Sequence, residues 1–315
     1  MGNHYHVVMR VDAARANALS DDEVLRRWTQ LFTGPVLVQR YLGGVPELLG
    51  QAERDKVGEF AQLYRQRLAD VSWFMRVLNE TIARQANAED GCTGRFWEGR
   101  FKSQALLDEQ ALLATMAYVD LNPIRAGMVE SLQDSAHTSI AARLAELQGK
   151  AFAPVRAPVV AAAVVEIPQH MNATPGLPAQ PLPSLLPEER LSALPKAPLM
   201  PFDPTGRFEQ AVPFGLEEYL DLVDTMGRSV HPSKRGAIPA STPRLLSRLG
   251  MDAEAFIACA DHFFKDFASA VGTPAKLIEL AAHRQQRCLR GLAAARRVFD
   301  AGRGMGARCR LWQAH

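Results

Sequence analysis

The chain has 315 residues, 47% of them hydrophobic and 22% charged, and a formal net charge of +2 at pH 7. This length suffices for two domains with cores of their own, and the nearly neutral charge argues against a protein that coats nucleic acid indiscriminately. Apolar stretches are short and interrupted and the N-terminus lacks the order of a secretory signal, so we expect a cytoplasmic protein without membrane contact. The 4 cysteines have no metal-binding spacing, which predicts reduced thiols.

The first predicted element is a β-strand over residues 4–11, HYHVVMRV, which is rich in β-branched and aromatic side chains. Residues i and i+2 of a strand point to the same side, so His4 and His6 would face one way together. Neutral imidazole is a common ligand of transition metals, and two such rings could hold a divalent cation. The alternative is that the histidines lie on a solvated sheet face without a metal.

Three helices are expected next along the chain. Ser20 and Glu23 form a capping box, which starts a helix near residue 21 that runs to about residue 31. Further helices are predicted over about 51–69 and 71–87. The helix over 71–87 places five side chains on one apolar face. They are Phe74, Val77, Leu78, Thr81 and Ile82.

A glycine-rich stretch, GCTGRFWEGRF over 91–101, cannot continue the third helix. FKSQALLD, residues 101–108, is typical of a short strand. DEQALLATMAYVDLNP predicts a helix that stops at Asn122, because the residue before Pro123 is disfavoured from helical geometry. The order of strand, helices, strand and helix predicts an α+β domain.

A proline-rich segment divides the chain. Residues 151–205 hold 12 of the 20 prolines, and such a run neither sustains a helix nor offers many donors to a sheet. We therefore predict an N-terminal domain over 1–148, a linker over 149–205 and a separate C-terminal domain over 206–315.

The C-terminal part is predicted to be all-helical. Thr273 and Pro274 form an N-cap and first-turn pair for a helix that runs to about Phe299, and residues 252–271 form another helix. The stretch 284–310 contains eight arginines and one acid. Such a run is usually a solvated helix face, and a nucleic-acid surface is the alternative.

Tyr118 and Asn122 are four residues apart on the predicted helix, so they are neighbours on one face. A phenolate can attack phosphorus and an amide oxygen can complete the shell of a cation, which are two parts of a metal-assisted phosphoryl transfer. The alternative is that Tyr118 is a half-buried helix residue and Asn122 a C-terminal cap.

Three blocks, HYH near the start, GRFWEGRFKSQALLD and AYVDLNPIRAGMV, follow one another within residues 1–140. In this order they resemble the single-tyrosine HUH transposases, and most closely the REP-associated tyrosine transposases of the insertion-sequence-200 type. The resemblance implies a ferredoxin-like HUH nuclease core with a helical insertion. It also implies that Tyr118 is catalytic and that His4, His6 and Asn122 hold Mg²⁺ or Mn²⁺.

The resemblance further implies DNA transposition by a mobile element. Such proteins bind hairpin-containing single-stranded DNA, cleave it through a 5′-phosphotyrosine intermediate and rejoin it with a free 3′-hydroxyl. The ester keeps the bond energy, so no nucleotide cofactor is needed, and catalysis depends on positioning and charge neutralisation at the phosphate. A homodimer associated with the nucleoid is the expected state.

The middle block combines cations with aromatic rings. Arg95, Arg100 and Lys102 could contact phosphates of a DNA strand, while the interleaved rings stack on bases. These rings belong to Phe96, Trp97 and Phe101. The alternative is that at least some of the rings pack under the sheet.

Members of this family carry a strand, a helix and a further strand before the two histidines, whereas three residues precede His4 here. Either the true start codon lies upstream, or the core is truncated at its N-terminus, and an edge strand without its partners holds its side chains poorly. An inactive relative that binds DNA or regulates is the alternative function. A metal-dependent hydrolase built on His4 and His6 is a third, for which the spacing offers no acidic ligand.

Overall fold

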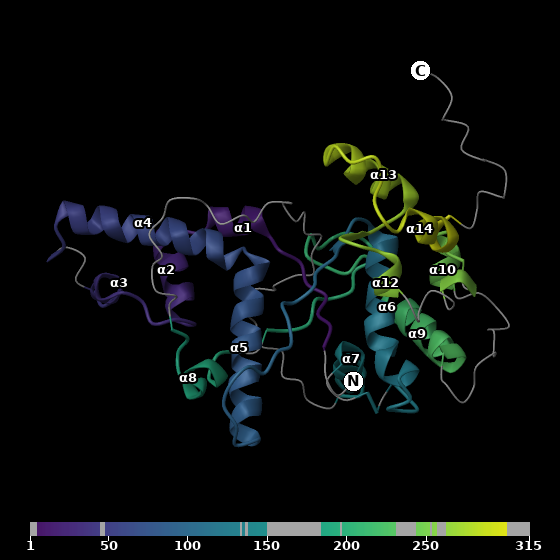
Figure 1. The fold of residues 1–315 in the computed structure, drawn as a ribbon, viewed down its shortest axis with the longest axis horizontal. Coiled ribbons are helices and arrows are strands. Elements are labelled where there is room, and N and C mark those ends of the chain that lie inside the picture. Colours follow the sequence, from purple (N-terminus) through teal and green to yellow (C-terminus); the bar gives the residue numbers. More distant parts are fainter. Residues whose placement is uncertain are drawn as a thin grey trace.

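The computed structural model describes residues 5–44, 48–132, 134–135, 138–149, 184–195, 197–230, 244–252, 254–256 and 263–300. These residues are mostly helical, and their one sheet has two short parallel strands (Figure 1). The predicted α+β class is confirmed in this coarse form. Among the described helices, none combines the length and apolar composition needed to cross a lipid bilayer.

The N-terminal segment differs from its prediction. Residues 5–12 form no strand, and the chain enters helix α1 (Ala13–Ala18) directly. Asp12 caps this helix, because its carboxylate accepts a hydrogen bond of 2.9 Å from the backbone N–H of Arg15. The strand prediction was wrong because a strand is stable only when a neighbour satisfies its backbone groups, and no described segment pairs with this one.

The next four helices are α2 (Asp21–Thr29), α3 (Val36–Leu42), α4 (Gln51–Leu68) and α5 (Val71–Glu89). Three of them were predicted from the sequence, whereas α3 was not. The hydroxyl of Ser20 accepts a hydrogen bond of 3.2 Å from the N–H of Glu23, which confirms the predicted start of α2. The apolar face of α5 is only partly confirmed: Val77 packs on a core, whereas Phe74 is 48% exposed.

These helices enclose a hydrophobic core that we call the aromatic core. Trp28 lies at its centre, stacked at 4.3 Å between ring centres on Phe32 and at 4.4 Å on Tyr64. Leu185 packs on this core from far along the chain, and its strand-like bridge with Phe32 fixes it there. Part of the predicted linker therefore packs on the first group of helices, while residues 151–183 lie outside the described residues.

Helix α6 (Glu109–Arg125) is longer than predicted. It continues past Asn122 and through Pro123, so the predicted end at Asn122 was wrong. The helix ends one turn later, where Gly127 adopts a left-handed φ of 68° and donates a hydrogen bond of 2.9 Å to the carbonyl of Ile124. Pro123 has no backbone N–H, so the helix continues here without the hydrogen bond to the carbonyl of Val119.

The second half of the chain contributes further helices and one strand. They are α7 (Ser139–Leu147), α8 (Glu188–Ser192), α9 (Leu216–Val230), α10 (Arg244–Arg248), α12 (Phe263–Asp266), α13 (Pro274–His283) and α14 (Leu292–Phe299). The single long helix predicted up to Phe299 is broken, because Gln285 and Gly291 have left-handed φ values of 54° and 111°. A side chain at Gly291 would also meet the ring of Phe267 at 2.5 Å.

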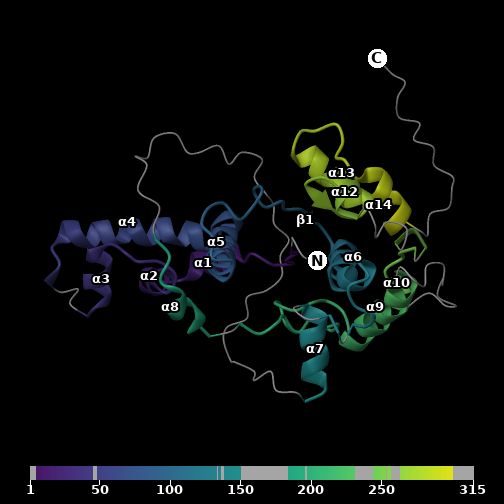
Figure 2. The same ribbon diagram turned by 60° about the horizontal axis from the view of Figure 1, so that its bottom comes forward.

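The two predicted domains share one core, which we call the central core. Strand β1 (Ala105–Leu106) pairs in parallel with β2 (Ala270–Val271), which confirms a short strand within 101–108. Helix α6 lies between α12–α14 on one side and α9 and α10 on the other (Figure 2). The C-terminal part is therefore neither all-helical nor separate, because its apolar side chains are buried against α6.

Candidate functional site

Tyr118 of α6 lies beside His6 of the N-terminal segment. The two ring centres are 5.8 Å apart and the planes meet at 77°, an edge-to-face contact. On its other side, Tyr118 stacks on Phe263 of α12 at 5.7 Å. Three segments far apart in the sequence thus meet around one phenol, and two of the predicted site residues are brought together.

Arg125 completes the polar end of this site. Its Nη2 donates a hydrogen bond of 2.8 Å to the Tyr118 hydroxyl and one of 3.2 Å to Oδ1 of Asn122. Its guanidinium carbon also lies 4.6 Å from the centre of the Tyr118 ring, in a cation–π contact. Positions i, i+4 and i+7 of a helix share one face, so α6 presents all three side chains together.

Sequence reasoning missed Arg125. The spacing of seven residues from Tyr118 could have identified it, but a helix ending at Asn122 leaves Arg125 outside the face. Because α6 runs through Pro123, the arginine instead comes back over the tyrosine. Predicting a helix end one turn too early therefore removed a site residue.

Metal binding by His4, His6 and Asn122 stays a prediction, because the structure describes only two of these three residues. His4 lies outside the described residues, and Oδ1 of Asn122 accepts its hydrogen bond from Arg125. Within the described residues, no group of three His, Cys, Asp or Glu side chains could hold a metal ion.

Asn122 itself is 3% exposed, and its Nδ2 finds no hydrogen-bond partner among the described residues. A buried amide normally satisfies both of its polar atoms. Its carbonyl oxygen accepts the hydrogen bond from Arg125, whereas the amide nitrogen is left without a partner in the described part of the chain.

Asp120 fixes the rotation of α6 from the opposite side. It is 1% exposed and accepts hydrogen bonds from Tyr219 Oη at 2.6 Å, Ser139 Oγ at 2.7 Å and the N–H of Ile140 at 3.2 Å. Burial raises the pKa of Asp120, although these hydrogen bonds act in the other direction. Residues two positions apart in a helix point about 200° apart around its axis. Tyr118 and Asp120 have this spacing, so anchoring Asp120 turns Tyr118 toward His6.

The basic and aromatic loop over 91–104 lies next to this site. Tyr5, which precedes His6, donates a hydrogen bond of 2.5 Å to Oδ1 of Asn79 and packs edge-to-face on Trp97 at 5.6 Å. Nε1 of Trp97 donates to the carbonyl of the same Asn79 at 2.9 Å. The N-terminal segment therefore joins the loop to α6, because consecutive residues contact each of them.

The predicted DNA-contacting cations differ in their roles. Arg95 donates hydrogen bonds of 2.8 Å to the carbonyls of Trp97 and Glu98, so it holds the loop in shape. Arg100 and Lys102 are exposed on the loop surface. Phosphate contact by these residues stays a prediction.

The rings of the loop lie mostly outside any core. Phe96 and Phe101 are 42% and 37% exposed, whereas Trp97 is half-buried against Tyr5. The alternative that they pack under a sheet fails for the two phenylalanines. Stacking on bases requires exposed rings, and cations beside them suit the phosphates of the same strand.

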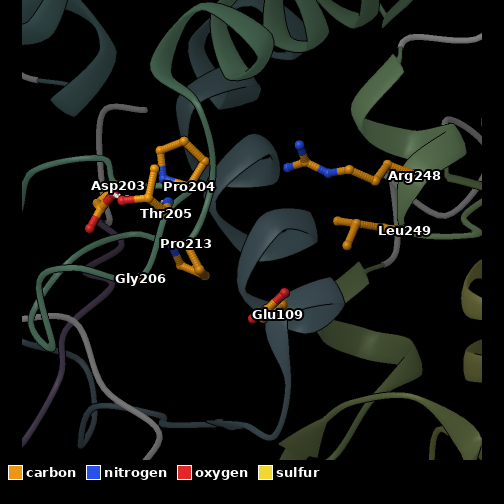
Figure 3. A pocket seen from close by; sticks show the side chains of 8 residues that line it. All are labelled: Glu109, Asp203, Pro204, Thr205, Gly206, Pro213, Arg248 and Leu249. Atoms are coloured by element: carbon orange, nitrogen blue, oxygen red, sulfur yellow. Dashed lines mark hydrogen bonds between the residues drawn. The ribbon is translucent and has the colours of Figure 1, made fainter.

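A separate pocket of about 430 Å³ lies at the start of α6 (Figure 3). Asp203 in its wall accepts hydrogen bonds from Thr205 and Phe208, which lower the pKa of Asp203 to about 2. Arg248, on the opposite wall, pairs with Glu218 at 2.9 Å. Asp203 and Arg248 are already engaged, and Tyr118 does not line this pocket, so we do not assign the site to it.

The arginine-rich stretch is described as far as residue 300. Arg290 donates to the carbonyl of Lys265 at 2.6 Å, and Arg297 lies 3.6 Å from Asp266, so part of this charge is used on α12. The described cysteines, Cys92 and Cys288, are free and exposed.

No protein-family model, curated protein or solved structure matches the chain.

Proposed function

We propose that this chain cleaves and rejoins single-stranded DNA through Tyr118, in the manner of a single-tyrosine HUH transposase. One observation carries the proposal: the phenol of Tyr118 and the imidazole of His6, far apart in the sequence, lie 5.8 Å apart around a common site. An arginine that donates to the phenol oxygen is the further element expected of an activated tyrosine nucleophile.

The proposed step is an in-line displacement at phosphorus. Oη of Tyr118 forms a bond to the phosphorus of a phosphodiester, and the bond from phosphorus to the 3′ oxygen of the upstream nucleotide breaks. The phenol proton passes to water, and the departing oxygen takes a proton from water to become a 3′-hydroxyl. The reverse attack by a 3′-hydroxyl rejoins a strand and restores the phenol without any nucleotide cofactor.

The loop over 91–104 supplies the binding surface in this proposal. Exposed Phe96 and Phe101 stack on bases, while Arg100 and Lys102 contact phosphates. Hairpin DNA as substrate, a homodimer and nucleoid association belong to the same proposal. The described residues contain two strands, fewer than a ferredoxin-like sheet requires, so the proposal rests on the geometry of the site rather than on that core.

A hairpin oligonucleotide labelled at its 3′ end tests the reaction. Because the downstream 5′ phosphate stays on the tyrosine, the label should migrate with the protein on a denaturing gel, whereas a 5′ label should be released on a shorter strand. Tyr118→Phe should abolish both products. Tyr5→Phe serves as the matched control, since it removes a phenol next to the site, and its adduct should persist.

A DNA-binding protein without cleavage is the second candidate. It is favoured by the absence of a strand over 5–12, which leaves His6 on a segment without sheet support. This candidate predicts hairpin binding that is the same for the wild type and Tyr118→Phe, with no labelled protein under any condition. An adduct that survives Tyr118→Phe would contradict both candidates.

A further inference from the structure

We propose that Arg67 and Arg76, stacked on the ring of Trp73, form a second contact for the phosphates of single-stranded DNA. This contact goes beyond the proposed function, because it lies on α4 and α5 and takes no part in cleavage. It rests on that function only for the identity of the anion, which is a phosphate of the DNA strand.

Two guanidinium groups lie on one indole ring. The guanidinium carbon of Arg67, in the last turn of α4, is 4.3 Å from the ring centre of Trp73, and that of Arg76 on α5 is 4.9 Å from it. Arg67 also lies 5.7 Å from the ring centre of Trp28. Both helices contribute because α5 follows α4 directly and runs in another direction (Figure 1). The bend between them therefore brings two cations to the same aromatic surface.

The electrostatics of Arg67 favour an anion at this place. Burial lowers the pKa of Arg67, Tyr64 acts in the opposite direction, and the charge of Arg76 lowers the pKa further. Within the described part of the chain, no carboxylate forms an ion pair with Arg67, whereas Arg76 lies 3.8 Å from Glu80. Like charges held at one ring repel each other, and a bound anion offsets this repulsion.

The chemistry of the side chains selects a phosphate. A planar guanidinium presents its N–H groups as a fork that matches phosphate oxygens, and stacking on a ring fixes its orientation. Both arginines are half-buried, so their stems are held while their ends reach solvent. The cations cover ring surface of Trp73 on which a base would stack, so we expect this contact to recognise phosphate alone.

Helix α5 connects this contact to the loop over 91–104. Asn79 accepts a hydrogen bond of 2.9 Å at its carbonyl from Nε1 of Trp97 in the loop. Arg76 lies three residues before Asn79, which is about 4.5 Å along the helix axis. Phosphates follow one another at about 3.4 Å along each strand of a duplex. A strand whose bases stack on the loop therefore has its next phosphates within reach of Arg76 and Arg67.

Binding of a labelled oligothymidylate to the full-length protein, followed by fluorescence anisotropy, tests this contact. A length of about 20 nucleotides exceeds the site of one single-strand-binding fold. Arg67→Gln should weaken binding about tenfold, as for the loss of one hydrogen bond to a charged group. It should also reduce the slope of log affinity against log salt by about 0.7. Arg54→Gln, which removes an exposed arginine elsewhere on α4, should change neither quantity.

Arg67→Lys separates the charge of this side chain from its packing. Lysine keeps the positive charge but lacks the planar group that stacks on the two indole rings. The salt slope should therefore stay at the wild-type value in Arg67→Lys, while urea unfolding should show similar losses of stability in Arg67→Lys and Arg67→Gln. A slope that falls equally in both variants would indicate general damage and overturn the contact.

An oligomer without bases tests whether the contact is with phosphate. Arg67→Gln should weaken binding of an abasic oligomer by the same factor as binding of oligothymidylate. Phe96→Leu in the loop should weaken binding of oligothymidylate only, because it removes a ring for stacking. Inorganic phosphate that displaces the oligomer from the wild type but not from Arg67→Gln, at matched ionic strength, would assign the contact to a free anion and overturn the DNA contact.

Adduct formation by Tyr118 with the 3′-labelled hairpin keeps this contact distinct from the proposed function. An unchanged salt slope in Arg67→Gln, in a protein whose wild type forms the adduct, would overturn the contact alone. No adduct from the wild type, together with the reduced slope in Arg67→Gln, would overturn the proposed cleavage and support the contact.

Discussion

The aromatic core and the central core are built in different ways. The aromatic core is formed almost entirely by residues 24–64, with Leu185 added from outside, and its largest side chains stack on one another. The central core collects segments from Ala105 to Phe299 around α6. The first is a local structure, whereas the second exists only when distant parts of the chain have come together.

The two cores also differ in chemistry. The buried polar side chains of the described residues lie with the central core or the segments packed beside it. They are Thr115, Asp120, Asn122, Ser135, Arg143 and Asp203. Buried polar groups cost free energy unless they are hydrogen-bonded, so a core that contains them is less suited to stability alone. We infer that the aromatic core stabilises the fold, while the central core positions the site.

The largest effect is expected in the aromatic core. Trp28→Ala should lower the free energy of unfolding by about 3–5 kcal/mol, because a ring that is 1% exposed leaves a cavity between Phe32 and Tyr64. Urea unfolding measures this. Phe74→Ala is the control, since its ring is 48% exposed and its loss should cost less than about 0.5 kcal/mol. Equal losses would contradict the assignment of this core.

Removal of one buried hydrogen bond should have the next largest effect. Tyr219→Phe deprives Asp120 of a donor at 2.6 Å and should cost about 1.5–3 kcal/mol, as for a hydrogen bond to a charged group. It should also slow adduct formation, because α6 loses an anchor. Tyr41→Phe removes a similar bond, to Asp22 at 2.7 Å, on the surface of the other region. Tyr41→Phe should leave adduct formation unchanged. Comparable slowing by Tyr41→Phe and Tyr219→Phe would contradict the inference that the central core positions the site.

Two carboxylates predict opposite dependences on pH. The folded-state pKa of Asp120 is raised above 3.8, so its contribution to stability is present below that pH and is lost as pH rises through the raised value. The folded-state pKa of Asp203 is lowered to about 2, so its contribution is present above pH 3.8 and is lost as pH falls toward 2.

Urea unfolding at a series of pH values measures both contributions. Asp120→Asn should abolish a loss of stability on the alkaline side of pH 3.8, and Asp203→Asn should abolish one on the acid side. A change of the same sign in both variants would show that the environments of the two carboxyls do not differ as described.

The smallest effect is expected on the loop. Alanine at both Arg100 and Lys102 should weaken hairpin binding and reduce the slope of log affinity against log salt by about 1 for each charge, without changing the free energy of unfolding. Lys56→Ala on α4 removes an exposed charge paired with Glu59 in the other region and should leave the slope unchanged. Fluorescence anisotropy with a labelled hairpin measures this. An unchanged slope in the loop variant would exclude these residues from the interface.

The difference between local contacts and contacts of distant segments also decides how much of the fold could be predicted. Helices α2, α4 and α5 were predicted to within a few residues, since caps such as Ser20 and short-range periodicity encode them. The strand over 4–11 was wrong in its described part and the C-terminal domain is not separate. Both depend on which distant segment a surface meets, and a single sequence carries no direct signal for that.

The site was predictable only in part. Tyr118 and Asn122 share a face by spacing, and the contact of Tyr118 with His6 followed only from the family resemblance. Arg125 was missed because the rule that a helix ends before proline outweighed its spacing. Phe263 and the anchor at Tyr219 were missed because they come from the half of the chain that we expected to fold apart.

The contact between Tyr118 and His6 is the claim on which the site depends most directly. Nuclear Overhauser spectra of protein labelled selectively in its histidine and tyrosine rings measure it, with Tyr118→Phe and His6→Gln to assign the signals. We expect a cross-peak between the imidazole of His6 and the ring of Tyr118 that is lost in both variants. Assigned resonances from both rings without such a cross-peak would contradict the site.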